Sequence, residues 1–281
     1  MNTIQLDSFA KINLSLDVLE EREDGYHNID TIMQLIDLKD VIEIECIDQN
    51  ECIIECNKQN IPLDHTNLVH KAWEALKKHT GIQQGIKVHI QKNIPVAAGL
   101  AGGSSNAAAV IKGLNEILGL NLSKEEMMEI GIGIGADVPY FFMGKTARAT
   151  GVGNIFEEIS PLKTVGVLIV NNGREISSKE VYEDIESSEK SKIGKVVSAI
   201  ENQDLNALRE SAYNTMERVV FEKYPKIHDI KNRLLSLGAD VVLMSGSGAT
   251  VFAITNTLEK RNGIYEELKE DYPIVFKAKT I

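Results

Sequence analysis

Hydrophobic and polar residues alternate along the first twenty positions of the chain. The apolar residues fall on even positions, at Ile4, Leu6, Ala10, Ile12, Leu14, Leu16 and Val18. A period of two predicts a half-buried strand, or a pair of strands, with one apolar and one polar face. Lys11 and Asn13 lie on the polar face and therefore project together, about 6.5–7 Å apart along the strand.

The pattern continues as a mixture of strands and helices, which predicts an α+β fold. Alternating apolar residues predict strands at 42–46 and 52–56, as a hairpin, and at 86–90, 165–170, 240–244, 250–254 and 274–279. Helical spacing predicts helices at 67–78, 107–118, 123–135, 192–202, 204–221 and 225–237, and a last one before the final strand. Ser123 and Ser177 each begin a capping-box pattern, and Asp137 should lie in the loop that follows the third helix.

The best candidate for a domain boundary lies near residues 150–162. Here "TGVGN" is followed by Pro161, a concentration of turn-forming residues between two well-patterned halves. We therefore expect two domains, residues 1–157 and residues 158–281. The length of 281 residues is sufficient for two domains with buried cores.

Composition narrows the class of protein. The formal net charge is −11, which argues against a general binder of nucleic acid or of anionic membranes. The N-terminal segment lacks the basic-then-apolar layout of a signal peptide, and the apolar runs are too short to span a bilayer, so we expect a cytoplasmic protein. The cysteines, Cys46, Cys52 and Cys56, have no second Cys/His pair at zinc-site spacing, so we expect reduced thiols and no metal site.

A glycine-rich stretch, "PVAAGLAGGSSNAAA" at 95–109, leads from a predicted strand into a helix. Gly99, Gly102 and Gly103 allow the backbone N–H groups to turn inward, where a helix N-terminus already offers unpaired donors and a positive dipole end. That combination suits a polyphosphate, but an ordinary strand-to-helix turn with a serine cap accounts for it equally well. No Walker-type motif is present. "GIGIGA" at 131–136 follows a helix rather than a strand, which disfavours a dinucleotide site.

A second glycine-rich stretch, "MSGSGAT" at 244–250, lies between two apolar runs. Alone it is as consistent with a flexible hairpin as with a binding loop. Two such loops in different halves of the chain would be natural if both faced one cleft.

Several separated segments resemble those of the galactokinase, homoserine kinase, mevalonate kinase and phosphomevalonate kinase (GHMP) superfamily. "PVAAGLAGGSSNAAA" is similar to its phosphate-binding loop, and "MSGSGAT" to its third glycine-rich motif. "AKINLSLDVLEEREDGYHNIDT" and "GADVPYFF" are similar to the branch whose acceptor is a cytidine-diphosphate-linked polyol. The resemblance implies the two-domain α+β GHMP-kinase fold, with the active site in a cleft between the domains.

The resemblance also implies an activity and a set of site residues. The expected reaction is transfer of the γ-phosphate of ATP, with Mg²⁺, to a hydroxyl group of the small-molecule acceptor. Asp137 matches the catalytic aspartate, which would accept the hydroxyl proton, and Lys11 matches the lysine that would keep the aspartate ionised. ATP-binding positions are Asn67, Lys92, Pro95, Val96, Ala97, Ala98, Gly99, Leu100, Ala101, Gly102, Gly103, Ser104, Ser105, Gly246 and Ser247. Acceptor-binding positions are Asn13, Tyr26, His27, Asp137 and Tyr182.

The chain departs from the superfamily pattern at Ala97 and Ala101, where relatives usually have glycine. Alanine is tolerated there if φ is negative and strained if φ is positive. Two other functions remain open, a kinase of this type for another hydroxylated metabolite and a catalytically silent ATP-binding regulator. We expect no nucleic-acid or membrane partner, and a monomer or weak homodimer.

Overall fold

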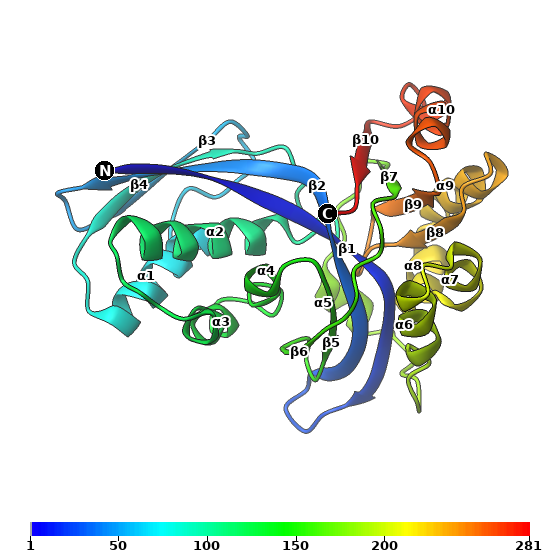
Figure 1. The fold of residues 1–281 in the computed structure, drawn as a ribbon, viewed down its shortest axis with the longest axis horizontal. Coiled ribbons are helices and arrows are strands. Elements are labelled where there is room, and N and C mark those ends of the chain that lie inside the picture. Colours follow the sequence, from blue (N-terminus) through cyan, green and yellow to red (C-terminus); the bar gives the residue numbers. More distant parts are fainter. Residues whose placement is uncertain (1) are drawn as a thin grey trace. The chain divides into compact units, whose positions relative to one another are not determined.

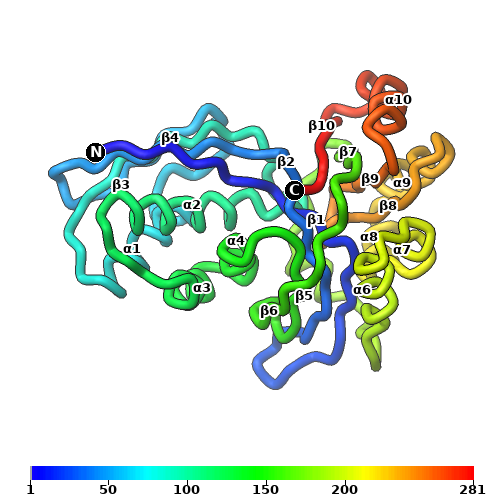
Figure 2. The backbone as a smooth tube through the Cα atoms, viewed as in Figure 1, coloured from blue at the N-terminus to red at the C-terminus, as the bar shows by residue number. Residues whose placement is uncertain are grey.

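The computed structural model describes residues 2–281, which fold into two compact units (Figures 1 and 2). Unit 1 comprises the residues up to Ala10, Lys39–Pro95 and Ala101–Gly144. Unit 2 comprises Lys11–Leu38, Val96–Leu100 and Lys145–Ile281. One boundary between the units falls inside the first glycine-rich loop, between Leu100 and Ala101. The two domains expected from the sequence, 1–157 and 158–281, are continuous segments of the chain, whereas these units are made of several segments each. The expected domains therefore stay a prediction.

Six strands form the first sheet. They are β1 (Thr3–Glu21), β2 (His27–Ile47), β3 (Cys52–Cys56), β4 (Gly85–Gln91), β5 (Thr146–Thr150) and β6 (Ile155–Glu158). Their order is β3-β4-β2-β5-β6, and β1 pairs with β2. The two long strands, β1 and β2, each run from one unit into the other.

The hairpin predicted from 42–46 and 52–56 is wrong. β4 lies between β2 and β3, antiparallel to β2 and parallel to β3. Parallel neighbours need a crossover connection, and the chain makes it through α1 (Leu68–Thr80), as the tube in Figure 2 shows. Both predicted strands exist, within β2 and as β3, but apolar alternation does not identify the neighbour of a strand.

The helices of unit 1 are α1, α2 (Gly102–Ile117), α3 (Lys124–Ile132) and α4 (Tyr140–Met143). Figure 1 shows α1 and α2 side by side, with α2 along the strands of this unit. The capping box predicted at Ser123 is confirmed, since Ser123 Oγ accepts from the Glu126 N–H and Glu126 Oε2 accepts from the Ser123 N–H.

The sheet of unit 2 has the order β10-β7-β9-β8. Its strands are β7 (Gly166–Asn171), β8 (Val241–Met244), β9 (Val251–Thr255) and β10 (Ile274–Lys279), all antiparallel. The helices are α5 (Ser178–Tyr182), α6 (Gly194–Glu201), α7 (Leu205–Ser211), α8 (Met216–Lys223), α9 (Pro225–Ser236) and α10 (Leu258–Leu268). A buried apolar core joins this sheet to α8, α9 and α10 and to parts of β1 and β2.

Two expectations for unit 2 are wrong. The predicted helix 204–221 is two helices, α7 and α8, separated by residues 212–215. The break occurs because the backbone of Tyr213 and Thr215 bonds to Leu16 of β1 instead of continuing the helix. The capping box predicted at Ser177 does not form either, because the Glu180 carboxylate accepts from the Tyr224 hydroxyl.

Strand β1 is more buried than a half-buried strand. From Ala10 to Val18 both faces are buried, including the polar residues Lys11, Asn13, Ser15 and Asp17.

The three cysteines are free thiols. Among the helices of residues 2–281, none has the length and apolar character needed to cross a membrane.

Candidate active site

The first glycine-rich loop (residues 95–105) has left-handed backbone at every second residue from Ala97 to Ala101. The φ angles are +48° at Ala97, +74° at Gly99 and +54° at Ala101. Such alternation turns neighbouring N–H groups towards one side and creates a concavity for an anion. The alanines therefore occupy the strained conformation, which costs roughly 1–2 kcal/mol at each residue.

Helix α2 begins inside this stretch, at Gly102, and no side chain caps its N-terminus. Ala101 is the N-cap and has no side-chain oxygen, so it cannot bond the first helical N–H groups. Gly103 is exposed and Ser104 is half-buried. Ser105 is turned inward, where its Oγ accepts from Ser8 Oγ at 2.7 Å. The alternative of an ordinary turn with a serine cap is therefore not what forms, and an uncapped helix N-terminus with its positive dipole end suits a negatively charged ligand.

Unit 1 gathers most of its predicted site residues around this helix end. A Cβ on Gly103 would lie 3.5 Å from Leu68 Cδ1, directly after Asn67. A Cβ on Gly135, two residues before Asp137, would lie 4.0 Å from Ser104 Oγ. The start of α1, the start of α2 and the turn before Asp137 are thus neighbours.

Lys92 and Asn67 already have protein partners. Lys92 is buried, forms an ion pair with the fully buried Asp40 and donates to Asn106 Oδ1 at 3.2 Å. Asp40 also accepts from the N–H groups of Asn93 and Ile94. Asn67 caps α1 by accepting from the Val69 N–H at 2.9 Å. Both residues stabilise segments that lie beside the N-terminus of α2. Their contact with nucleotide stays a prediction.

Asp137 lies in the turn between α3 and α4, as predicted, and is half-buried. Tyr140, one helical turn later, is fully buried. Burial raises the pKa of the Tyr140 hydroxyl well above its usual value, and the nearby Asp137 carboxylate raises it further. The Tyr140 phenol therefore stays protonated beside this carboxylate.

Unit 2 holds the other predicted catalytic residue, Lys11, in a buried polar chain. Lys11 is 4 % exposed and its Nζ donates to Asn13 Oδ1 at 2.8 Å. Asn13 Nδ2 donates to Thr31 Oγ1 at 2.9 Å, and Thr31 donates to the Ser15 carbonyl. The Lys11 N–H donates to the Leu100 carbonyl at 3.1 Å, which places β1 against the first loop. Hydrogen bonds compensate the burial of these polar groups.

The second glycine-rich loop (residues 244–250) lies against the same elements of unit 2. Ser245 Oγ donates to the Gly99 carbonyl at 2.9 Å. A Cβ on Gly246 would lie 3.5 Å from both Asn13 Oδ1 and the Gly99 carbonyl oxygen. Ser247 Oγ and Ser178 Oγ, at the start of α5, form a hydrogen bond of 2.8 Å. The second loop thus contacts the first loop, Asn13 and helix α5, which carries Tyr182.

Two of the three predicted base-binding aromatic residues meet in unit 2. The rings of His27 and Tyr182 stack with centroids 5.5 Å apart and an interplanar angle of 23°. Tyr26 is 68 % exposed, beyond the Asp24-Gly25 turn that Arg22 stabilises through its ion pair with Asp24. A large exposed aromatic side chain beside a stacked pair is typical of a surface that receives a planar ligand.

The sequence interpretation missed three buried or partly buried residues around the loops. They are Asp40, which orders the strand before the first loop, and Asn214 and Glu217, which bond the backbone of the second loop. Asn214 and Glu217 lie three residues apart, and this N-x-x-E spacing is a helix-start signal. It was available from the sequence and would have placed the start of α8 to within one residue.

No group of three His, Cys, Asp or Glu side chains capable of holding a metal ion exists among residues 2–281. This finding does not conflict with a magnesium-dependent phosphotransferase. Mg²⁺ in such enzymes is held by one or two carboxylates together with the phosphates of the substrate.

Comparison with known proteins defines the class. Residues 67–145 match the family model "GHMP kinases N terminal domain", and residues 196–274 match "GHMP kinases C terminal". The chain belongs to the GHMP kinase family.

Individual relatives narrow the class further. A protein of Finegoldia magna named 4-diphosphocytidyl-2-C-methyl-D-erythritol kinase is 48 % identical over 99 % of this chain and 100 % of its own length. Proteins of the same name from Thermoanaerobacter pseudethanolicus and Clostridioides difficile are 44 % and 42 % identical, over 100 % and 98 % of this chain and 97 % and 95 % of their own lengths.

Solved structures agree on the fold. A crystal structure of 4-(cytidine 5'-diphospho)-2C-methyl-D-erythritol kinase covers 99 % of both chains with a TM-score of 0.84 and 25 % identity. A homoserine kinase from Cytophaga hutchinsonii, 17 % identical, covers 100 % of this chain and 95 % of its own with a TM-score of 0.81, and shares the fold. The predicted α+β GHMP-kinase fold is confirmed.

Proposed function

We propose that the protein transfers the γ-phosphate of ATP to the 2-hydroxyl group of 4-diphosphocytidyl-2-C-methyl-D-erythritol, a step of non-mevalonate isoprenoid biosynthesis. The observation that carries this proposal is near-full-length identity of 42–48 % to proteins named for that reaction. The buried Lys11, the loop aspartate Asp137 and both glycine-rich loops are present together in this chain.

ATP is the phosphoryl donor in this proposal. The alternating left-handed backbone of the first loop and the uncapped N-terminus of α2 supply N–H donors and a positive dipole end for its phosphates. Gly246 of the second loop adjoins Gly99, and Gly246 and Ser247 would complete the nucleotide contacts. Mg²⁺ would take its ligands chiefly from the phosphates, where it neutralises their charge.

Asp137 and Lys11 carry the chemistry on the acceptor. The Asp137 carboxylate accepts the proton of the attacking hydroxyl. The Lys11 ammonium, oriented by Asn13 Oδ1, offsets charge on the transferred group. The neutral Tyr140 phenol beside Asp137 adds no competing negative charge.

The cytosine ring of the acceptor binds at the aromatic residues of unit 2. His27 and Tyr182 are 5.5 Å apart, whereas a ring between two others needs roughly 7 Å, two contact distances of about 3.5 Å. The acceptor therefore separates the two rings by about 1.5 Å, or stacks on Tyr26 and leaves them together. The branch of superfamily kinases with acceptors that lack a base has no use for these rings.

The test is direct. Purified protein with ATP and Mg²⁺ is assayed by coupled release of ADP on diphosphocytidyl-methylerythritol, mevalonate, homoserine and galactose. We expect turnover on the first alone, and a loss of roughly 10²–10⁴-fold in kcat for Asp137→Asn, because a general base contributes about that much. Turnover on another acceptor contradicts the substrate. ATP binding without turnover on any acceptor supports the silent regulator instead.

A control variant separates chemistry from binding. Asp184→Asn changes a carboxylate of the surface pair with Lys223, outside the site residues named above, and should leave kcat unchanged. The oligomeric state, predicted as a monomer or weak homodimer, is read from the same preparation by light scattering.

A further inference from the structure

The second glycine-rich loop is held from behind by the residues that begin α8. Asn214 is 4 % exposed, and its Nδ2 donates to the carbonyls of Met244 and Gly246, each at 2.8 Å. Its Oδ1 accepts from the Met216 N–H at 3.0 Å. Both donor hydrogens and the acceptor of this amide are thus used, which fixes its orientation.

Glu217 holds the same loop by a charged contact. Its Oε1 accepts from the Met244 N–H at 2.8 Å, and its Oε2 accepts from Lys231 Nζ at 2.6 Å. Glu217 and Lys231 are only 13 % and 21 % exposed at their side chains, so water screens the pair weakly. Hydrogen bonds to a charged acceptor are stronger than neutral ones.

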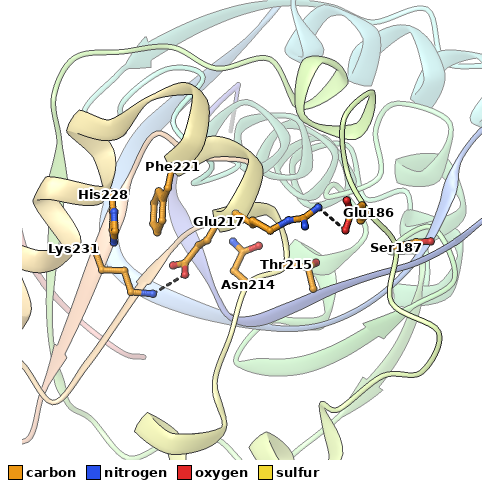
Figure 3. Close-up of a pocket in the computed structure, with 9 residues that line it drawn as sticks. Glu186, Ser187, Asn214, Thr215, Glu217, Phe221, His228 and Lys231 are labelled. Atoms are coloured by element: carbon orange, nitrogen blue, oxygen red, sulfur yellow. Dashed lines mark hydrogen bonds and ion pairs between the residues drawn. The ribbon is translucent and has the colours of Figure 1, made fainter.

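These residues line a pocket of about 600 Å³ on α8 and α9. Figure 3 shows Glu217 and Lys231 joined across it, with Asn214 beside them and the stacked rings of Phe221 and His228 near Lys231. A second pair, Arg218 and Glu186, lines the same pocket. Arg218 has only Glu186 as its ion-pair partner in the described chain and is far more exposed, at 60 %.

The bonded carbonyls have a geometric consequence on the other side of the loop. With the Met244 and Gly246 carbonyls held by Asn214, the carbonyl of the intervening Ser245 faces Gly99, whose added Cβ would lie only 2.1 Å from it. Ser245 Oγ reaches the Gly99 carbonyl on the same side. The hydrogen bonds from Asn214 and Glu217 thus determine which atoms of the second loop contact the first loop.

We propose that Asn214 and Glu217, with Lys231 orienting Glu217, are positioning residues for nucleotide binding. They fix the backbone of Met244–Gly246 so that Ser245 and Gly246 lie against Gly99. This inference rests on the proposed ATP-binding role of both loops. None of the positioning residues touches the nucleotide, and their effect is transmitted through the loop backbone.

The experiment measures the Kd of ATP by titration calorimetry without acceptor, together with the KM for ATP and the thermal midpoint. Glu217→Ala should weaken ATP binding about tenfold, since a hydrogen bond to a charged group is worth about that factor. Glu217→Gln keeps an oxygen for the Met244 N–H and should restore the Kd to within about threefold. Lys231→Met is the milder variant, expected to weaken binding about threefold, and replaces Glu217→Ala if that variant does not fold.

Arg218→Met is the matched control, because Arg218 lies in the same pocket and one residue along the same helix. It should leave the Kd of ATP unchanged. A purely structural role for Glu217 would lower the thermal midpoint while the Kd stays at the value of the unmodified protein, and that result overturns the inference. Because binding is measured without acceptor, a wrong acceptor in the proposed function does not affect this test. An unmodified protein that does not bind ATP overturns both.

Discussion

The two glycine-rich loops both contain left-handed backbone, but they place different residues at the left-handed positions. In the second loop the left-handed positions are Gly246 and Gly248, with φ of +56° and +87°. In the first loop they are Ala97, Gly99 and Ala101. Glycine adopts positive φ without strain, whereas alanine does so at a cost. The shape of the first loop is therefore maintained by its surroundings, since its sequence opposes that shape at Ala97 and Ala101.

The largest effect is expected from a substitution at the central glycine of the first loop, Gly99. Gly99→Ala would place a Cβ 2.1 Å from the Ser245 carbonyl oxygen, a backbone atom that cannot move alone. With the left-handed strain added, we expect a loss of roughly 3 kcal/mol in the free energy of unfolding. Urea denaturation measures it, and ATP binding should weaken as the loops separate. A loss below about 1 kcal/mol would mean that the two loops move apart freely.

The corresponding change in the second loop should be milder. At Gly246 an added Cβ has no contact closer than 3.5 Å, so only the left-handed conformation is penalised. We therefore expect Gly246→Ala to cost roughly 1–2 kcal/mol in unfolding free energy. The same denaturation series checks it. If Gly246→Ala lowers the free energy of unfolding as much as Gly99→Ala does, the close contact at Gly99 is not the cause of the larger loss.

The sequence predicted these loops and their family well, and their neighbours poorly. The superfamily resemblance, the fold and the place of Asp137 in a turn were correct. The local pattern could not reveal that β4 separates β2 from β3, that Tyr213 bonds β1, or that Asn214 bonds the second loop. Each of these depends on a partner far away in the chain, and periodicity reports only local burial.

Burial on β1 shows the same limit in one residue. The alternation of apolar and polar residues predicts that Lys11 lies on the polar face of a half-buried strand. It is instead buried, because its face is covered and its ammonium is bonded to Asn13. A polar residue on an alternating strand can face water or a buried site, and only its partners distinguish these cases.

The smallest effect we predict concerns the alanines themselves. Ala97→Gly and Ala101→Gly remove the left-handed strain, roughly 1–2 kcal/mol, but they give the unfolded chain more freedom, which costs about 0.4–1 kcal/mol. Each should therefore gain about 0.5 kcal/mol in unfolding free energy. Among residues 2–281 the left-handed alanines are Ala97 and Ala101, so the buried Ala98 between them is the matched control. Ala98→Gly removes no strain and should lose about 1 kcal/mol. Opposite signs for neighbouring alanines in one denaturation series would establish that the first loop is held against its own sequence, whereas a loss at all three positions would refute the strain.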